Sequence, residues 1–293
     1  MMAAIFSASP ATDRGRMMVR TLLIRGMLAG AVAGLLAFGF GKLVGEPQVD
    51  RAIAFEARMD EAKNSTPQAN AHTQAHVHGP GMSGLAMQHE AGGTELVSRT
   101  VQGGLGLFTG VLVYCTAFGG LFALVFAYAN GRAADLGSRA LSALLAGAGF
   151  VAVYLMPSLK YPASPPAVGE PDTIGYRTAL YFILMAISIA AMVGAAILRK
   201  RLVVRHGAWS AALMAAAAYL IVVIAAQLLL PDVNEVPDAF PAVLLWQFRL
   251  AALGMQGVLW ATIGLLFGAL TEREADRRVV FGASRMTAMG KGL

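Results

Sequence analysis

The sequence predicts an all-α protein: a polytopic transmembrane helical bundle of about six spans with both termini in the cytoplasm. Charged residues make up only 14% of its 293 residues, whereas soluble domains carry about 25%. Apolar residues, 57% of the chain, are gathered in long blocks, and the mean hydropathy is +0.61. Blocks of roughly 20 apolar residues match the thickness of a bilayer's hydrocarbon core.

Six blocks approach this length, at residues 22–44, 105–129, 141–157, 178–198, 209–230 and 248–270. The first is longer than the apolar part of a secretory signal peptide, which spans about 7–15 residues, so we interpret it as an uncleaved span. The third is the shortest, and its helix could begin nearer Ser138. We therefore expect a cytoplasmic segment at 1–20, a transmembrane domain at 21–270 and a cytoplasmic basic tail at 271–293.

The connections between these blocks alternate in charge. Lys and Arg are concentrated before the first block, in 130–140, in 199–206 and after residue 270. The remaining connections contain most of the acidic residues, including Glu46, Asp50, Glu170, Asp172 and Asp232. Because cytoplasmic loops are enriched in Lys and Arg, this alternation favours an even number of spans and places both termini inside the cell.

Composition and motifs exclude several classes of function. The net charge is +6 and the pI about 9.7, but the basic residues flank apolar blocks and form no nucleic-acid-binding motif. The chain has no phosphate-binding loop, no nucleophile elbow and no His-Glu-x-x-His pattern. Its single cysteine, Cys115, cannot form a disulfide within the chain. We therefore expect neither an enzyme nor a nucleic-acid partner.

Small residues recur within the spans. Gly26, Gly30 and Gly34 repeat every four residues in the first block, and Gly106 and Gly110 lie in the second. This spacing lets helix backbones approach closely in lipid. We favour packing between helices of one chain over a face that binds a second copy.

The outer connection, at about 46–100, contains an unusual histidine cluster. Its segment 64–93 is rich in Ala, Gly, Gln and Ser, a composition that indicates disorder or order that depends on a bound metal. Four of the chain's five histidines lie there: His72, His76, His78 and His89. Imidazole is a natural ligand for Co, Ni, Zn and Cu ions, so we favour metal binding over a polar loop without a ligand.

Polar residues in or beside the later blocks suggest a pathway. Arg249 and Gln256 are seven residues apart and therefore share one helix face, and Gln227 lies one turn before Pro231. Polar groups inside a membrane often mark a route for substrate or ions. These three residues could line a polar cavity whose outer mouth carries Glu46, Asp50, Glu170 and Asp172. Hydrogen bonds between neighbouring spans would explain the same residues equally well.

Several short motifs together resemble the bacterial CbtA family, a proposed cobalt transporter subunit. They are GEPQVDRAI at 45–53, the His-rich outer loop, ELVSRTVQ at 95–102, YPA at 161–163 and GEPD at 169–172. The resemblance covers about residues 18–270. It implies a multi-pass protein of the plasma (inner) membrane, and members of the family are commonly described with five spans.

The resemblance also implies a role in cobalt uptake for cobalamin synthesis. The partner that it implies is a small CbtB-like subunit with one spanning helix and its own histidines. We therefore expect uptake of a divalent transition metal, Co²⁺ first and Ni²⁺ or another divalent ion second, with no permanent cofactor. The alternative is a non-transporting membrane subunit that binds metal for a separate transport or metal-insertion complex.

Overall fold

The computed structural model describes residues 10–65, 101–132 and 136–290, and every element in these ranges is helical. The all-α prediction is confirmed for this part of the chain. The first helix, α1 (Pro10–Phe40), continues through a π-helical turn, η1 (Gly41–Gly45), into α2 (Glu46–Ser65). A second π-helical turn, η2 (Gln102–Gly106), leads into α4 (Leu107–Ala129).

The rest of the chain follows the same pattern. Helix α5 (Ser138–Gly149), the π-helical turn η3 (Phe150–Leu155) and α6 (Met156–Lys160) are continuous. A short 3-10 helix, η4 (Pro171–Thr173), precedes α7 (Ile174–Leu229), and α8 (Ala242–Gly290) is the last helix described. The third apolar block thus begins at Ser138 and extends to Lys160, a stretch of 23 residues.

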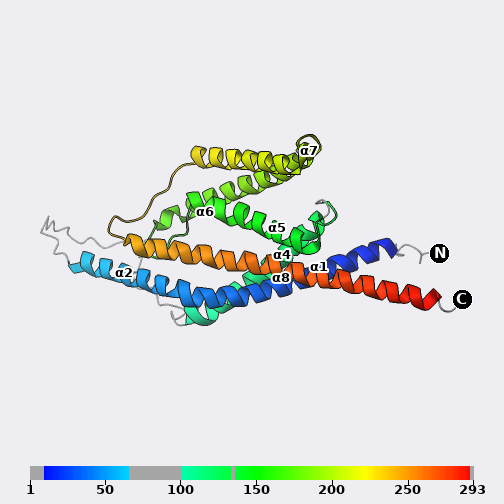
Figure 1. Ribbon diagram of the computed structural model, residues 1–293. Coiled ribbons are helices and arrows are strands. Elements are labelled where there is room, and N and C mark those ends of the chain that lie inside the picture. Colours follow the sequence, from blue (N-terminus) through cyan, green and yellow to red (C-terminus); the bar gives the residue numbers. More distant parts are fainter. Residues whose placement is uncertain (1–9, 66–100, 133–135, 291–293) are drawn as a thin grey trace, which may run out of the picture.

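Five helical stretches in the described residues are long and apolar enough to cross a membrane: Val19–Ala62, Gly103–Ala129, Ser138–Lys160, Pro171–Leu229 and Ala242–Arg273. The fourth is 59 residues long and contains two of the six predicted blocks. It reverses at Gly207, whose φ of 76° and ψ of 167° are not helical. Figure 1 shows α7 folded back on itself, and the Ser188 and Tyr219 hydroxyls are hydrogen-bonded across its two arms at 2.9 Å.

The predicted outer loop at 46–100 begins with a helix instead of a loop. Helix α2 extends the first span to Ser65, because residues 46–65 are rich in Ala, Glu and Arg, which are good helix formers. The four histidines of the predicted metal site, together with the rest of 66–100, lie outside the described residues.

The core of the bundle is formed by α1, α4, α5 and α8. Ala33, Phe126, Leu141 and Ile263 are buried together there, one from each of these helices. The glycine stripe of α1 faces α4. A Cβ added to Gly26 or Gly30 would overlap a backbone carbonyl oxygen of α4, and one on Gly34 would lie 3.1 Å from the Cα of Leu112. The stripe is therefore used for packing within the chain, as predicted.

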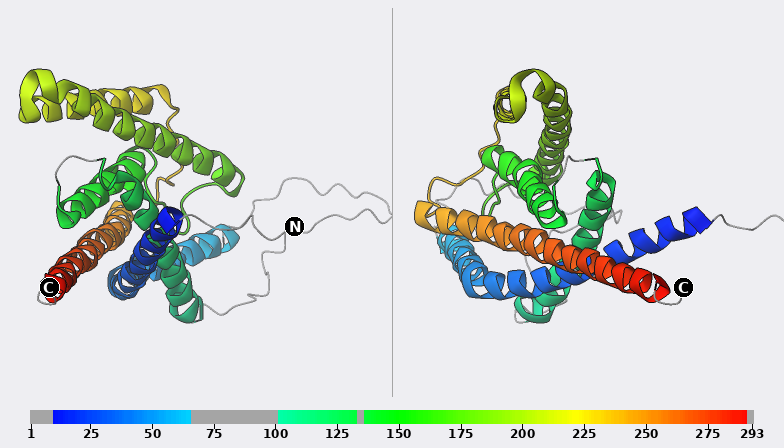
Figure 2. Two further views of the ribbon diagram at one scale, coloured as in Figure 1. Left: turned by 90° about the vertical axis from the view of Figure 1, so that its right-hand side faces the viewer. Right: turned by 45° about the vertical axis from the view of Figure 1, so that its right-hand side comes forward.

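The α7 hairpin lies to one side of this core, as both views of Figure 2 show. It contacts the remainder of the chain mainly through α6 and η3. Leu228 and Leu229 near the end of its second arm are 80% and 85% exposed. Large apolar side chains that are exposed to this extent are suited to lipid and not to water.

Two of the π-helical turns end two residues before a proline. Pro47 follows η1 and Pro157 follows η3, in each case at the second residue after the turn. Proline has no N–H to donate to the carbonyl four residues earlier and its ring crowds that carbonyl, so the helix must widen or kink. For Pro157 that carbonyl belongs to Val153, and it accepts a 3.3 Å hydrogen bond from the Tyr181 hydroxyl instead.

The connections gather at two ends of the bundle (Figure 1). At one, which we call the basic end, α1 begins, α8 ends and α7 reverses; Lys200 there donates to the carbonyl of Arg132 at 2.6 Å. Arg139 and Glu272 form an ion pair at the same end. At the other, the acidic end, lie the connections 161–173 and 231–241, and Lys160, the last residue of α6, forms an ion pair with Asp232 there.

Candidate functional site

Among the described helices, two of the cavities are lined by residues that the sequence singled out. The first, which we call the three-helix cavity, has a volume of about 260 Å³ and lies between α1, α4 and α8. Its lining includes Ala37, Tyr114, Cys115, Met255 and Gln256. The second, which we call the arginine cavity, has a volume of about 430 Å³ and lies at the acidic end.

The three-helix cavity combines apolar walls with soft donor atoms. Cys115 is 2% exposed because α1 packs closely over it. Met255 reaches toward the π-helical turn of the first span, since its sulfur would lie 3.7 Å from a Cβ placed on Gly41. Thiol, thioether and amide groups can each bind a transition metal, and the sulfur atoms favour softer ions.

The arginine cavity is built where the acidic-end connections meet the starts of α7 and α8. Arg177, in the first turn of α7, and Arg249, in α8, both line it. Its other polar residues include Tyr154, Ser158, Asn234 and Glu235. Tyr161, which also lines it, donates a hydrogen bond from its hydroxyl to the carbonyl of Pro231 at 2.8 Å and so links the two connections.

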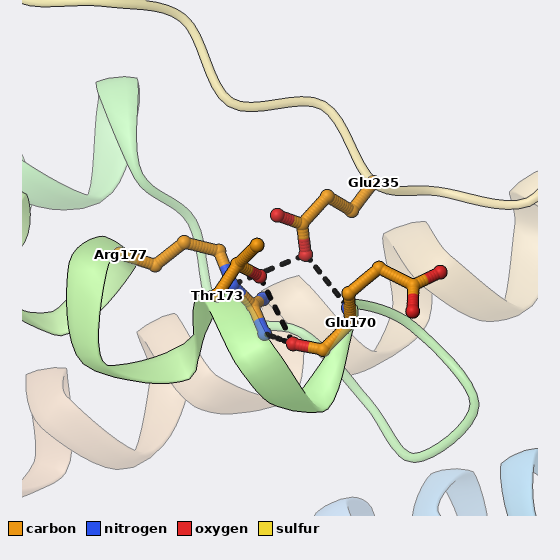
Figure 3. Close-up of polar contacts among 4 residues, drawn as sticks. All are labelled: Glu170, Thr173, Arg177 and Glu235. Carbon is orange, nitrogen blue, oxygen red and sulfur yellow. Dashed lines mark hydrogen bonds and ion pairs between the residues drawn. The ribbon is translucent and has the colours of Figure 1, made fainter.

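Glu235 organises this end of the molecule, as Figure 3 shows. Its Oε2 accepts the backbone N–H of Glu170 at 2.8 Å and lies 3.2 Å from Nε of Arg177. The Nε–H of Arg177 is not aimed at the carboxylate, so the contact between Arg177 and Glu235 is an ion pair without a hydrogen bond. The Thr173 hydroxyl is 2.9 Å from the Glu170 carbonyl and also lies within reach of Glu235.

These contacts change the acidity of Glu235. Its pKa is lowered from the ordinary value of 4.5, first by the Thr173 hydroxyl, then by the backbone N–H of Glu170, with a smaller effect of Arg177. Hydrogen bonds to a carboxylate favour its charged form. The carboxylate is therefore held ionised at neutral pH, where it pins 169–177 to the 231–241 connection.

The structure separates residues that the sequence grouped together. Arg249 lines the arginine cavity and Gln256 the three-helix cavity, although they share one helix. Gln227 lines neither cavity and donates to the carbonyl of Met156 at 2.9 Å. For Gln227, the structure thus shows a hydrogen bond between neighbouring helices and not a place in a polar cavity.

The predicted mouth residues lie along the acidic end. Glu46 begins α2, and its Oε2 would be 2.7 Å from a Cβ on Gly103, so the carboxylate lies against the start of α4. Beside it, Lys42 donates to the carbonyl of Gly103 at 3.0 Å. Asp50 is exposed on α2, Glu170 is exposed just before η4, and Asp172 is exposed within it. Among the described residues, no three His, Cys, Asp or Glu side chains are grouped closely enough to hold a metal ion.

Sequence reasoning missed Arg177, Thr173 and the central position of Glu235. One signal was available for Arg177: it is a single cation just after an acidic connection and at the start of a long apolar block. Nothing in the sequence indicates that Glu235, 58 residues further along the chain, is its partner, because that contact depends on the reversal of α7.

Comparisons with known proteins agree with the resemblance seen in the motifs. The family model described as "Probable cobalt transporter subunit (CbtA)" matches residues 19–272. The match covers all five membrane-length stretches of the described residues, except for Arg273, the last residue of the fifth stretch. No curated protein and no solved structure matches the chain.

Proposed function

Because the chain belongs to the CbtA family of probable cobalt transporter subunits, we propose that it takes part in the uptake of a divalent transition metal. Co²⁺ is the first candidate cargo and Ni²⁺ the second. The observation that carries this proposal is the family match over residues 19–272, which includes nearly all of the membrane-length helices. The metal is cargo, so no permanent cofactor is needed.

The proposed topology has six crossings. The arms of α7 at 174–206 and 208–229 are each long enough to span a hydrocarbon core, which takes roughly 20 residues. Six crossings agree with Figure 1, in which the start of α1, the end of α8 and the reversal of α7 all lie at the basic end. Cytoplasmic loops are enriched in Lys and Arg, so the basic end faces the cytoplasm and the acidic end faces outward.

In this topology, the histidine segment is the capture site for the ion. His72, His76, His78 and His89 belong to the connection between α2 and α4, and both helices meet that connection at the acidic end. A chain rich in Gly and Ala can gather three or four imidazoles around one ion, although it imposes little geometry and gives little selectivity. The carboxylates of Glu46, Asp50, Glu170 and Asp172 raise the local concentration of cations there.

The three-helix cavity is the proposed route inward from this end. Gln256 and the sulfur atoms of Cys115 and Met255 supply donor groups within an otherwise apolar wall. Arg249 is not part of this route, because a guanidinium in the arginine cavity would repel a divalent cation.

The capture role is tested by metal accumulation in cells. The variant changes His72, His76, His78 and His89 together to Ala, and the matched control is His206→Ala, since His206 is exposed at the basic end. At limiting Co²⁺ the quadruple variant should accumulate several-fold less metal, and the difference should shrink at high Co²⁺. Equal uptake by the quadruple variant and the control at limiting metal would remove the capture role.

A second function is favoured by one word of the family description, "subunit". The chain could hold metal for a separate complex, with a small single-span CbtB-like protein as its partner. Expression with and without that partner distinguishes the two functions in cells. A transporter retains some uptake by itself, whereas an accessory subunit gives none without the rest of its complex.

A further inference from the structure

The arginine cavity has a charge that cation transport does not explain. Two guanidinium groups, from Arg177 and Arg249, line it together with one carboxylate, Glu235. That carboxylate is already paired with Arg177 and with the backbone N–H of Glu170. The cavity therefore carries one positive charge more than its own acid balances.

Arg249 carries this excess charge. Its Nε is buried and has no hydrogen-bond partner. Among residues 10–65, 101–132 and 136–290, no group forms a hydrogen bond or an ion pair with its guanidinium. The side chain is half-buried, and polar atoms that are withdrawn from water are normally paired, because otherwise they lose their hydration without compensation. An anion in the cavity would supply the missing partner.

The neutral groups around Arg249 are also suited to an anion. Tyr154 and Asn234 line the same cavity, and neither side chain donates a hydrogen bond to a described group. A hydroxyl and an amide N–H can both donate to an oxyanion, and the planar guanidinium presents paired donors that match phosphate geometry. The volume of about 430 Å³ is within the range of ligand sites.

The depth of the cavity identifies the class of anion. Arg177 is three residues from the start of α7, and Arg249 is seven residues from the start of α8. At a rise of 1.5 Å per residue, both lie within about 10 Å of the helix ends. In a membrane this is the level of the lipid head groups, where phosphate is abundant.

We propose that the arginine cavity binds a phosphate group, held by Arg249 with support from Arg177. The group can come from a phospholipid of the outer leaflet or from soluble phosphate. The proposal concerns an anion and does not depend on the metal cargo, so it can fail or succeed separately from the proposed function.

The test uses the purified full-length chain in delipidated detergent with two phosphate probes. In one arm inorganic phosphate is added, and binding is followed by calorimetry. In the other, native mass spectrometry compares phosphatidylglycerol with a glucosyl diacylglycerol that carries no phosphate. Binding of phosphatidylglycerol alone assigns the lipid head group, and binding of inorganic phosphate assigns a soluble ligand; either outcome supports the site.

The decisive variant is Arg249→Gln, and its matched control is Arg205→Gln, which removes a charge from an exposed residue at the basic end. Arg249→Gln should weaken phosphate binding at least tenfold, whereas the control should stay within twofold of wild type. Without phosphate, Arg249→Gln should melt at the same or a higher temperature, since it removes an unpaired charge. If Arg249→Gln does not fold, Arg249→Lys replaces it, with weakened but measurable binding expected. Equal binding by wild type and the variant, or no binding of either probe, would overturn the proposal.

Discussion

Individual glycines determine how closely the helices of this bundle approach. A Cβ on Gly30 would overlap the carbonyl oxygen of Cys115, whereas one on Gly39, in the same helix, would meet nothing within 4 Å. The four-residue spacing predicts that the stripe meets another helix. It does not predict that this helix is α4, because small residues recur in other blocks as well, such as Gly257, Gly264 and Gly268 in the sixth.

Gly30→Ala should therefore destabilise the bundle where Gly39→Ala does not. Overpacking a close contact costs about 1–3 kcal/mol, whereas Ala at an open helical position is neutral or slightly favourable. Thermal unfolding of the two variants in the same detergent measures the difference. Equal melting temperatures would mean that α1 and α4 do not meet at this glycine.

Glu235 gives the acidic end a dependence on pH. Its pKa is lower in the folded protein than the ordinary value of 4.5. A lowered folded-state pKa contributes stability that is fully present above 4.5 and is lost as the pH falls through the folded value. Arg177, which favours the ionised form, is paired with it, and Arg249 lines the same cavity. The exposed carboxylates Glu170 and Asp172 belong to the segment that it contacts.

We expect the melting temperature of wild type to fall more than that of Glu235→Gln when the pH is lowered from neutral to below 4.5. Glu170 and Asp172 are present in both proteins, so the difference between them isolates Glu235. Parallel curves for the two proteins would show that the contacts in Figure 3 do not contribute to stability.

At the scale of the elements, the six predicted blocks lie, to within one residue, inside the five membrane-length helices, but the predicted ends are inaccurate. The third block was predicted to end at Pro157, but the helix continues to Lys160 because η3 accommodates the proline one turn earlier. The first span was predicted to end at Val44, but it continues into α2 for the same reason at Pro47. Hydropathy reports where lipid begins, and it does not report where a helix stops.

Gly207 is the residue on which the α7 hairpin depends. Its φ of 76° and ψ of 167° lie in a region that is open almost only to glycine. Gly207→Ala should destabilise the hairpin by about 1–3 kcal/mol, visible as a lower melting temperature and faster proteolysis at 199–206. Gly175→Ala, at an open position with ordinary backbone angles, is the control and should leave both unchanged. A variant as stable as this control would contradict the sharp reversal.

At the scale of the whole molecule, the alternation of charge predicted which connections lie together. The segments at 130–140 and 199–206 are joined by Lys200 and Arg132, as expected for loops on one side. The division into two cavities was not predictable. A spacing of seven residues places Arg249 and Gln256 on one face of α8, but different neighbours cover that face at different depths.

The proposed topology is tested with single cysteines in a Cys115→Ser background. Cysteines replace Val204, which is 86% exposed, and Gln74, which lies in the histidine segment. In intact cells a membrane-impermeant maleimide should label Gln74→Cys and should label Val204→Cys only after the cells are opened. Labelling of both positions in intact cells would contradict six crossings with the histidines outside.

The most direct test of the central claim is cobalt influx into sealed liposomes containing the full-length chain, with and without a single-span CbtB-like partner. The vesicles contain an impermeant chelator, so that radioactive Co²⁺ can enter downhill without an energy source. If the chain takes part in transport, cobalt should accumulate in a form that an external chelator does not remove. If the external chelator removes all bound cobalt, both with and without the partner, the proposal of metal uptake is wrong.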